Sequence, residues 1–461
     1  MQISADDLVR LLGTWRAGDG LAGGLADRLA GLIRDGRLPA GTRLPAERPL
    51  AAALDVSRTT VAAALLELRT QNLVATRHGS GTRVRLAPDA ALEAMTAWTV
   101  PPRHRQGELD WSAATPAHAP AEVHEAYRAA LDRLPFTGTG YTAAGLAELR
   151  RAIADLYTGR GLATRPDQIC VTAGAQQAIE LVLRTELRTY DRVLVESPTY
   201  PGALDVLRAR RARPQAVAVG TEWSMSTLLA GLRDPAYRLA YLMPGLHNPT
   251  GRSMPAEQRA RLRDAAGTTD ALILVDDVFA DLATPPYDAP ARFRRGTRVA
   301  RVASLSKTVW GGLRVGWVRA DRATVHRLAA EKSRSDLGSA VLEQLAAVDL
   351  LARYPELLAR RRRSLAESVR RLRESLAAEV PALTVLSEGS GPSLWCRLPA
   401  GLTSTALTAA AARSGLRLVD ASRFSPDGRT QRFVRLPVDL SPTDRPEAIR
   451  RLAEAVRTAT R

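Results

Sequence analysis

The alternation of hydrophobic and polar positions changes along the 461-residue chain. From Asp110 onward, short apolar runs alternate with longer segments whose apolar residues recur at helical spacing, which predicts strands alternating with helices. The expected strands are 168–172, 192–196, 240–243, 271–276 and 299–304, and the expected helices include 175–188, 255–266 and 355–377. Such alternation predicts an α/β domain with a mostly parallel sheet that is covered by helices on both faces.

The first 85 residues show a different pattern, in which short amphipathic helices lead into a hairpin. Residues 1–19 read as a short lead. The elements expected after it are helices over 22–35 and 58–69, a helix that opens over 44–50, and strands over 73–76 and 81–85. Ser57 stands where its side chain can cap the helix that follows it. The pattern predicts a helix-turn-helix followed by a winged hairpin.

Composition and length place the chain among globular proteins of more than one domain. Hydrophobic residues make up 45% of it and charged residues 25%, which is unlike a disordered chain. Prolines and a charged run make 86–109 a candidate linker. The expected domains are therefore 1–85 and 110–461, joined by that linker, in keeping with the two or three domains that the length suggests.

Charge and cysteine content restrict the partners and the compartment. The net charge of +17 favours an anionic partner or simply reflects arginine-rich coding, and composition does not separate these two readings. Cys170 and Cys396 form neither a disulfide framework nor a metal-site spacing, so no metal is expected. We expect a cytoplasmic protein, because no secretion signal or membrane-spanning apolar run of ~20 residues is visible.

Three runs in the first region carry a specific resemblance. They are 36–48, 56–61 and 78–82, and together they closely resemble the GntR family of winged-helix DNA-binding domains. The resemblance implies that double-stranded operator DNA is contacted by Arg48, by Ser57, Arg58, Thr59 and Thr60 at the start of the recognition helix, and by His78, Gly79 and Ser80 at the wing tip. Arginine forks onto guanine, and hydroxyl groups bond phosphates or bases. Ala62 stands where the family often has another arginine, which shifts the expected specificity to Arg48 and Arg58.

Lysine is almost absent from the chain, which has only Lys307 and Lys332 among 65 lysines and arginines. Arginine stays protonated and cannot supply the free amine that forms an imine with an aldehyde, whereas lysine can. Lys307 follows Ser304 by three residues and precedes Arg314, an arrangement that suggests a Schiff-base lysine beside a phosphate-binding cation. Lys332 fits an ordinary surface lysine.

Further segments supply groups that fit the same chemistry. The turn 171–178 leads a strand into a helix whose first backbone N–H groups form a seat for a phosphate. Tyr200 follows a strand and can stack on an aromatic ring, or can be a core residue. Asn248 offers an amide, and Asp276 ends a strand with a carboxylate that can pair with a ring nitrogen or can merely cap the strand.

These segments, with Gly140-Tyr141 before them, resemble in order the fold-type-I enzymes of the aspartate aminotransferase group, which use pyridoxal 5′-phosphate (PLP). The resemblance covers Asp110 to the C-terminus and implies a smaller C-terminal α+β subdomain. It implies Lys307 as the Schiff-base lysine, Asp276 as the partner of the ring nitrogen, Asn248 as the contact of the ring hydroxyl, Tyr200 as the stacking aromatic, Ala175, Gln176, Ser304 and Arg314 as the phosphate site, and Tyr141 as a contact to the phosphate of a neighbouring subunit. Arg435 would grip the substrate α-carboxylate, with one more solvated arginine as the alternative.

Two departures from that group bear on activity. Val278 and Phe279 stand where a tyrosine usually donates to the ring hydroxyl, and Ala175 stands where a hydroxyl residue is frequent. Loss of the tyrosine hydroxyl predicts slow exchange of the imine. We therefore expect PLP binding without steady-state turnover, and an aminotransferase half-reaction is left open.

A GntR-type winged helix, a linker and an aminotransferase-like domain together resemble the MocR subfamily of bacterial transcription regulators. That resemblance implies a head-to-tail, domain-swapped homodimer that sits on the nucleoid when bound to DNA. It also implies a PLP-dependent regulator of vitamin B6 or amino-acid and amine genes, which senses PLP or an amino compound through imine exchange at Lys307, with the linker as the relay. The alternative is an active PLP-dependent aminotransferase with an autoregulatory DNA-binding head. The arginines near 360–363 and 370–373 are expected to form a solvated face rather than a DNA contact.

Overall fold

The computed structural model describes residues 2–13, 15–16, 20–34, 37–77, 81–85, 107–134, 138–284, 293, 296–389 and 391–460. Contacts within the chain divide it into two units. Unit 1 comprises Met1–Ala113, Arg371–Leu386 and Trp395–Arg461, and unit 2 comprises Ala114–Arg370 and Ser387–Leu394. The winged helix and the C-terminal segment therefore belong to the same unit. Residues 86–106, the main part of the expected linker, lie outside the described residues.

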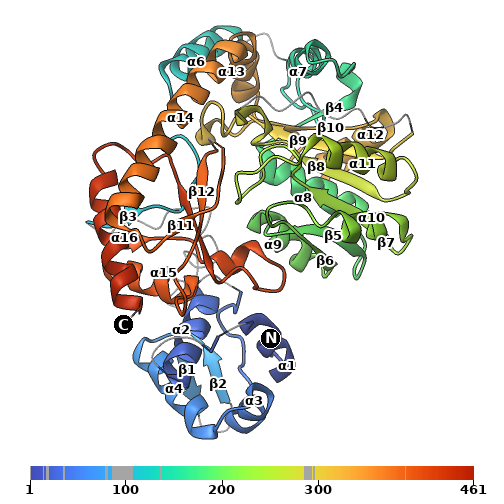
Figure 1. Cartoon of the computed structure of the whole chain (residues 1–461). Coiled ribbons are helices and arrows are strands. Elements are labelled where there is room, and N and C mark those ends of the chain that lie inside the picture. Colours follow the sequence, from blue (N-terminus) through green and yellow to red (C-terminus); the bar gives the residue numbers. More distant parts are fainter. Residues whose placement is uncertain are drawn as a thin grey trace. The chain divides into compact units, whose positions relative to one another are not determined.

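The N-terminal part of unit 1 is a winged helix, drawn in blue in Figure 1. Its elements are α1 (Ala5–Leu12), α2 (Leu21–Arg34), α3 (Glu47–Leu54), α4 (Arg58–Thr70), β1 (Val74–Arg77) and β2 (Gly81–Val84). The two strands pair antiparallel. The Ser57 hydroxyl accepts a hydrogen bond from the backbone N–H of Thr60 at 3.0 Å, so it caps α4 as predicted. The expected helix-turn-helix with a hairpin is confirmed.

The expectation that residues 1–19 form only a lead is wrong for α1. Ser4 caps this helix by accepting a hydrogen bond from the N–H of Asp7. Leu8 and Leu12 are fully buried in the same hydrophobic cluster as α2, α3 and α4. Its apolar residues recur at helical spacing, but eight residues are shorter than the window over which periodicity predicts a helix, and the shared core stabilises it.

The C-terminal part of unit 1 is a small α+β subdomain, as expected. Its sheet has the strand order β11-β12-β14, and the short strand β3 pairs parallel with β13. Its elements are β3 (Leu109–Asp110), β11 (Thr384–Val385), β12 (Ser393–Arg397), α15 (Ser404–Arg413), β13 (Leu416–Arg417), the 3-10 turn η5 (Ala421–Phe424), β14 (Phe433–Pro437) and α16 (Arg445–Thr460). Helices α15 and α16 pack against each other.

Unit 2 is built on a seven-stranded sheet in the order β4-β10-β9-β8-β7-β5-β6, in which only β10 runs antiparallel to its neighbours. The strands are β4 (Ile169–Thr172), β5 (Arg192–Ser197), β6 (Arg213–Ala218), β7 (Tyr237–Leu242), β8 (Leu272–Asp276), β9 (Val299–Ser304) and β10 (Gly316–Arg319). The mostly parallel sheet is confirmed. Strand β7 begins three residues earlier than expected, because the polar Arg238 interrupts its apolar pattern.

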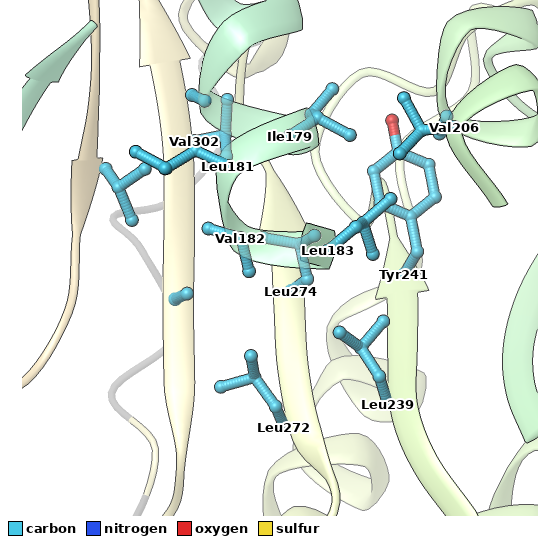
Figure 2. Packing of buried hydrophobic residues seen from close by; sticks show 14 of the residues in the cluster. Ile179, Leu181, Val182, Leu183, Val206, Leu239, Tyr241, Leu272, Leu274 and Val302 are labelled. Carbon is cyan, nitrogen blue, oxygen red and sulfur yellow. The ribbon is translucent and has the colours of Figure 1, made fainter. Parts of the chain in front are cut away.

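Helices cover both faces of this sheet. They are α6 (Ala121–Arg133), α7 (Ala147–Gly159), α8 (Ala175–Glu186), α9 (Pro201–Ala209), α10 (Met225–Arg233), α11 (Ala256–Ala266), α12 (Arg322–Ser335), α13 (Val341–Ala352) and α14 (Tyr354–Glu379), with 3-10 turns η2 (Pro166–Gln168), η3 (Ala280–Leu282) and η4 (Gly311–Leu313). Leu272 and Leu274 pack with α8 and α9 in one cluster, as Figure 2 shows for the two leucines and the buried face of α8. Ile273 and Val275 pack with α10 and α11 in another. Burial on both faces explains the nearly continuous apolar runs of these strands.

One expectation about basic residues is wrong, and another holds only in part. Lys332 is not a surface lysine: it is fully buried, and its Nζ atom donates to both carboxylate oxygens of Asp336 at 2.7 and 2.9 Å. The arginines near 360 and 370 form a solvated face only in part: Arg360, Arg363, Arg370 and Arg371 are exposed. In contrast, Arg361 donates to the carbonyl of Lys307 and Arg362 to that of Asp281. Sequence pattern alone does not reveal such tertiary partners.

Among the described residues, no single helix combines the length and the apolar character that a membrane crossing needs. The bent pair of α3 and α4 meets the test of length and composition only when the two helices are taken together.

We expect Leu274→Ala to destabilise unit 2 by ~2–5 kcal/mol, because the leucine is fully buried in the sheet and its truncation leaves a cavity. The matched control is Leu131→Ala on α6, where the side chain is 54% exposed and a change within about 0.5 kcal/mol is expected. Urea unfolding followed by circular dichroism measures both. Equal losses in the two variants would contradict the described core.

Candidate cofactor and DNA-binding sites

The predicted cofactor residues follow the carboxyl ends of the parallel strands. The strand ends are Thr172 on β4, Ser197 on β5, Leu242 on β7, Asp276 on β8 and Ser304 on β9. In the register of the sheet, Gly316 pairs with both Thr172 and Ser304, and Asp276 pairs with Val302. Because parallel strands end at one edge, the motifs after them converge there, which is where α/β sheets bind ligands.

The N-terminus of α8 forms a seat for an anion. Gly174 precedes the helix with a φ of 88°, a backbone conformation that favours glycine. A Cβ atom on Gly174 would lie 2.7 Å from a guanidinium nitrogen of Arg314, so this arginine packs directly against the turn. Arg314 also donates to the carbonyl of Ala173 at 2.5 Å. The first N–H groups of α8, at Ala175 and Gln176, and the adjacent guanidinium suit a phosphate.

Lys307 lies three residues beyond the end of β9 and is half-buried. Its Nζ atom lies 5.9 Å from the centre of the Phe279 ring, and its carbonyl accepts a hydrogen bond from Arg361 at 3.1 Å. Ser304 is buried, and its hydroxyl accepts from the N–H of Ser306. The backbone that carries the lysine is therefore held from two sides, while the amine faces an aromatic ring.

Asp276 is a buried carboxylate with two protein donors. The Tyr241 hydroxyl donates to one carboxylate oxygen at 2.5 Å, and the N–H of Val278 donates to the other at 3.0 Å. Burial raises the pKa of Asp276 to about 6 despite these hydrogen bonds. Burial also raises the pKa of Tyr241 well above its usual value, so the tyrosine stays the donor. A cation beside Asp276 would offset the cost of ionising this carboxylate.

Asn248 lies beside a buried polar network. Its amide oxygen is buried and has no hydrogen-bond partner among the described residues. Next to it in sequence, the ring of His247 lies 3.5 Å from the carboxylate of Glu196, which also accepts from Trp223 at 2.5 Å. Tyr200, after β5, is partly buried against the core cluster of α8 and α9. These contacts fix the segments that carry Asn248 and Tyr200.

The donor set fits PLP. A helix N-terminus with Arg314 suits the phosphate, and a buried carboxylate held by neutral donors suits the protonated ring nitrogen. The unsatisfied amide oxygen of Asn248 suits a donor such as the ring hydroxyl, since buried polar atoms are rarely left unpaired. Lys307 is half-buried among these strand ends and supplies the amine.

Two predicted contacts differ in their surroundings. Tyr141 is 75% exposed, which leaves its side chain accessible to another subunit. Arg435 belongs to unit 1, where it lies on β14 and is buried. It donates to the carbonyl of Ser112, and its guanidinium lies 5.0 Å from the centre of the Phe424 ring. Arg435 is therefore not a solvated arginine.

Two cavities accompany the sheet of unit 2. One, of about 690 Å³, is lined by residues at the amino ends of the strands, including Arg238 and Arg298. The positive charge of the arginines that line it is partly balanced, since Arg298 and Arg327 both pair with Glu186, at 2.6 and 2.7 Å. The other, of about 270 Å³, is lined in part by Val278 and Ser304 and borders the cofactor site.

The predicted DNA contacts of the winged helix are accessible. Arg48, Ser57, Arg58 and Thr59 are exposed, and Thr60 is half-buried. Arg58 pairs with Glu47 of α3 at 2.9 Å, although its side chain is 62% exposed. Exposed ion pairs of this kind contribute little, so DNA can displace it. His78, Gly79 and Ser80 lie outside the described residues.

Sequence reasoning missed Tyr241 as a partner of Asp276. The tyrosine stands within the apolar strand β7, and its pattern is that of a core residue, which it also is (Figure 2). It also missed Arg28 and Asp420, which form a buried ion pair in unit 1. A buried arginine is not distinguishable by pattern in a chain in which nearly every cation is arginine.

Comparisons with known proteins agree with this geometry. Residues 108–452 match the family described as aminotransferase class I and II, and residues 21–84 match bacterial regulatory proteins of the gntR family. The HTH-type transcriptional regulator TauR of Rhodobacter capsulatus is 30% identical over 94% of this chain and 97% of its own length. The 2-aminoadipate transaminase of Thermus thermophilus is 29% identical over 68% of this chain and 80% of its own length.

Among solved structures, LysN, an α-aminoadipate aminotransferase from Thermus thermophilus complexed with N-(5′-phosphopyridoxyl)-L-leucine, is similar with a TM-score of 0.69. It is 27% identical and covers 77% of this chain and 93% of that chain. Class I and II aminotransferases are PLP-dependent enzymes, and homologues that also carry the N-terminal domain are named as transcriptional regulators. The chain therefore belongs to the class I and II aminotransferase family and, with a GntR DNA-binding domain ahead of that domain, to the MocR-type transcription regulators.

Proposed function

We propose that this regulator binds PLP at the carboxyl edge of the unit 2 sheet and senses PLP or an amino compound there to control operator binding. The observation that carries the proposal is the convergence of Lys307, Asp276 and the N-terminus of α8 in a chain that also has a recognition helix. The regulated genes would belong to vitamin B6 or amino-acid and amine metabolism.

Each residue of the site has a role in this proposal. When bound, PLP supplies an aldehyde that links covalently to an amine and a ring that withdraws electrons. Lys307 provides the amine, Asp276 holds the proton at the ring nitrogen, and Tyr241 orients that carboxylate through its 2.5 Å hydrogen bond. The N–H groups at the start of α8, together with Ser304 and Arg314, bind the phosphate. Tyr200 stacks on the ring and Asn248 contacts its hydroxyl.

The effector must bind two states of the protein with different affinity, since otherwise it shifts no equilibrium. Exchange of the amine linked to PLP, from Lys307 to a ligand, provides such a difference. Arg435 binds the carboxylate of a ligand that has one. The exposed Tyr141 supports a head-to-tail, domain-swapped homodimer in which this residue reaches the partner's phosphate site.

A working aminotransferase is the second candidate. The complete donor set for PLP and the similarity to a 2-aminoadipate transaminase favour it. Phe279 opposes it, because a ring without a hydroxyl faces Lys307 at 5.9 Å where the group's tyrosine would donate a hydrogen bond. A single half-reaction, without turnover, is compatible with both candidates.

The proposed regulatory function predicts that PLP changes the affinity of the protein for DNA from upstream of its own gene. A gel-shift titration at stated salt, with and without PLP, measures this change. In Lys307→Arg, which keeps the charge but cannot form an imine, the response should disappear while binding without PLP is retained. Specific binding that ignores PLP points to an amino-compound effector. Absence of specific binding, with steady keto-acid production from an amino donor, would contradict the proposal in favour of the enzyme.

Arg58→Ala should weaken operator binding about 5- to 150-fold, because a base contact by arginine contributes ~1–3 kcal/mol. The absorbance of bound PLP should not change. The control is Arg450→Ala on α16, which removes the same charge from an exposed arginine paired with Glu447 and should leave the affinity unchanged. Fluorescence anisotropy with labelled operator compares the two. An unchanged affinity in Arg58→Ala would show that the recognition helix is wrongly assigned.

Asp276→Asn should weaken PLP retention yet stabilise the PLP-free chain at pH 8. The folded-state pKa of about 6 lies above the usual 3.8, so stability falls as pH rises from about 4 to about 6 and stays lower above it. The neutral amide removes this penalty, at most about 3 kcal/mol, and the gain should shrink at pH 5. Thermal unfolding at both pH values and equilibrium dialysis of PLP measure the two effects.

The control for this variant is Asp277→Asn at the next position. Asp277 pairs with the buried Arg301 at 2.7 Å, so its neutralisation strands a buried charge and should destabilise the chain at pH 8. Loss of stability in both variants would contradict the role of burial at Asp276.

A further inference from the structure

A buried arginine ties the winged helix to the C-terminal subdomain within unit 1. Arg28 on α2 is 1% exposed. Its guanidinium donates to the carboxylate of Asp420 at 3.1 Å and to the hydroxyl of Ser422 at 2.8 Å. It also donates to the carbonyls of Leu11 and Leu12, at 3.2 and 2.7 Å. One side chain thus joins α1, α2 and the residues around η5.

The acceptor side of this contact is rigidly held. The carboxylate of Asp420 accepts hydrogen bonds from Ser404 at 2.5 Å, from Thr405 at 2.8 Å and from the N–H of Ser422 at 2.9 Å. Burial alone would raise the pKa of Asp420, but the charges of Arg28 and Arg37 hold it at about 2. The ion pair is therefore present throughout the physiological range, and its buried groups are satisfied.

The 3-10 turn η5 also contacts Arg435, the arginine that is predicted to bind the carboxylate of a ligand. Phe424, the last residue of η5, is fully buried. The guanidinium of Arg435 lies 5.0 Å from the centre of its ring, within the range of a cation–π contact. On another side, Phe424 packs edge-on against Trp395, with 5.8 Å between the centres of the two rings. The short segment 420–424 therefore contains both the groups that hold Arg28 and the ring that contacts Arg435.

The geometry points to η5 as the relay between effector and DNA: an amino compound that bears a carboxylate, bound by Arg435, would act on the winged helix through Phe424, Ser422 and Arg28. The inference rests on the proposed function, which assigns the carboxylate contact to Arg435. A guanidinium that gains an anion is attracted less strongly to the ring beneath it, because the anion offsets the field of the cation. A shift of Phe424 then moves Ser422, which belongs to the same short turn, and Asp420, which caps that turn.

This relay is a different route from the one expected from the sequence, in which the linker of residues 86–109 carries the signal. It passes through buried, hydrogen-bonded groups, which transmit a displacement because the packed interior does not deform continuously. It also restricts the effector class: an amine without a carboxylate leaves Arg435 unchanged and should not signal by this route.

The test compares two probes that differ in the carboxylate. The phosphopyridoxyl adduct of 3-methylbutylamine lacks this group, whereas N-(5′-phosphopyridoxyl)-L-leucine carries it on an otherwise identical side chain. The full chain is loaded with either probe, and its affinity for operator DNA is measured by anisotropy at one salt concentration. In the wild type the two affinities should differ at least about fivefold, the lower end of allosteric coupling.

Ser422→Ala and Arg28→Lys should reduce that ratio to about one, because each removes part of the fork that joins α2 to η5. Affinity with the 3-methylbutylamine adduct should change little. The control is Ser414→Ala in the same subdomain, whose hydroxyl donates to the carbonyl of Ala410, and it should keep the wild-type ratio. Hydrogen exchange should also rise in α2 in Ser422→Ala and not in Ser414→Ala.

The outcomes separate the relay from the proposed function. A wild-type ratio that persists in Ser422→Ala and Arg28→Lys overturns the relay and leaves the sensor intact. Equal DNA affinity with both probes in the wild type overturns the sensing of a carboxylate and the relay with it. A ratio lost equally in Ser414→Ala would show general loosening of the subdomain and would also overturn the relay.

Discussion

The cofactor site depends on the parallel course of the unit 2 strands, which brings their carboxyl ends to one edge of the sheet. Asp276 ends β8 and pairs with Val302 of the neighbouring β9, and Gly316 of β10 pairs with both Ser304, at the end of β9, and Thr172, at the end of β4. Segments more than a hundred residues apart thereby supply a carboxylate, an amine and a phosphate seat to one place. Helices on both faces exclude water from this sheet, and the same burial gives Asp276 its raised pKa.

Buried charge is used twice in different ways. At Asp276 a desolvated carboxylate is held by a tyrosine hydroxyl and a backbone N–H, both neutral, which suits the cationic ring nitrogen of the proposed site. At Asp420 the carboxylate has Arg28 and two hydroxyl donors, and it joins two parts of unit 1. The first arrangement favours binding, whereas the second favours transmission of a displacement, because a satisfied buried pair is costly to break.

The grouping of the winged helix with the C-terminal subdomain changes how regulation can work. A DNA-binding head on a flexible tether would respond to its effector only through the linker. Here α2 contacts α15 and the turn η5, and η5 in turn packs under Arg435. In the proposed relay, the arginine that the aminotransferase resemblance assigns to the substrate carboxylate would be the start of a route to DNA. Substrate recognition and signalling would then share one residue.

The sequence by itself determined the two-part organisation, the mostly parallel sheet and the identity of the motifs, because strand alternation, glycine turns and a rare lysine are local signals. The eight residues of α1 were too short a segment to predict a helix from periodicity, although its leucines pack into the shared core. Partners distant in sequence were decided by tertiary structure alone: Tyr241 with Asp276, Arg28 with Asp420, and the buried pair of Lys332 with Asp336. The physical reason is that a pattern reports which residues are apolar, whereas the pairing of buried polar groups depends on which surfaces the completed fold brings together.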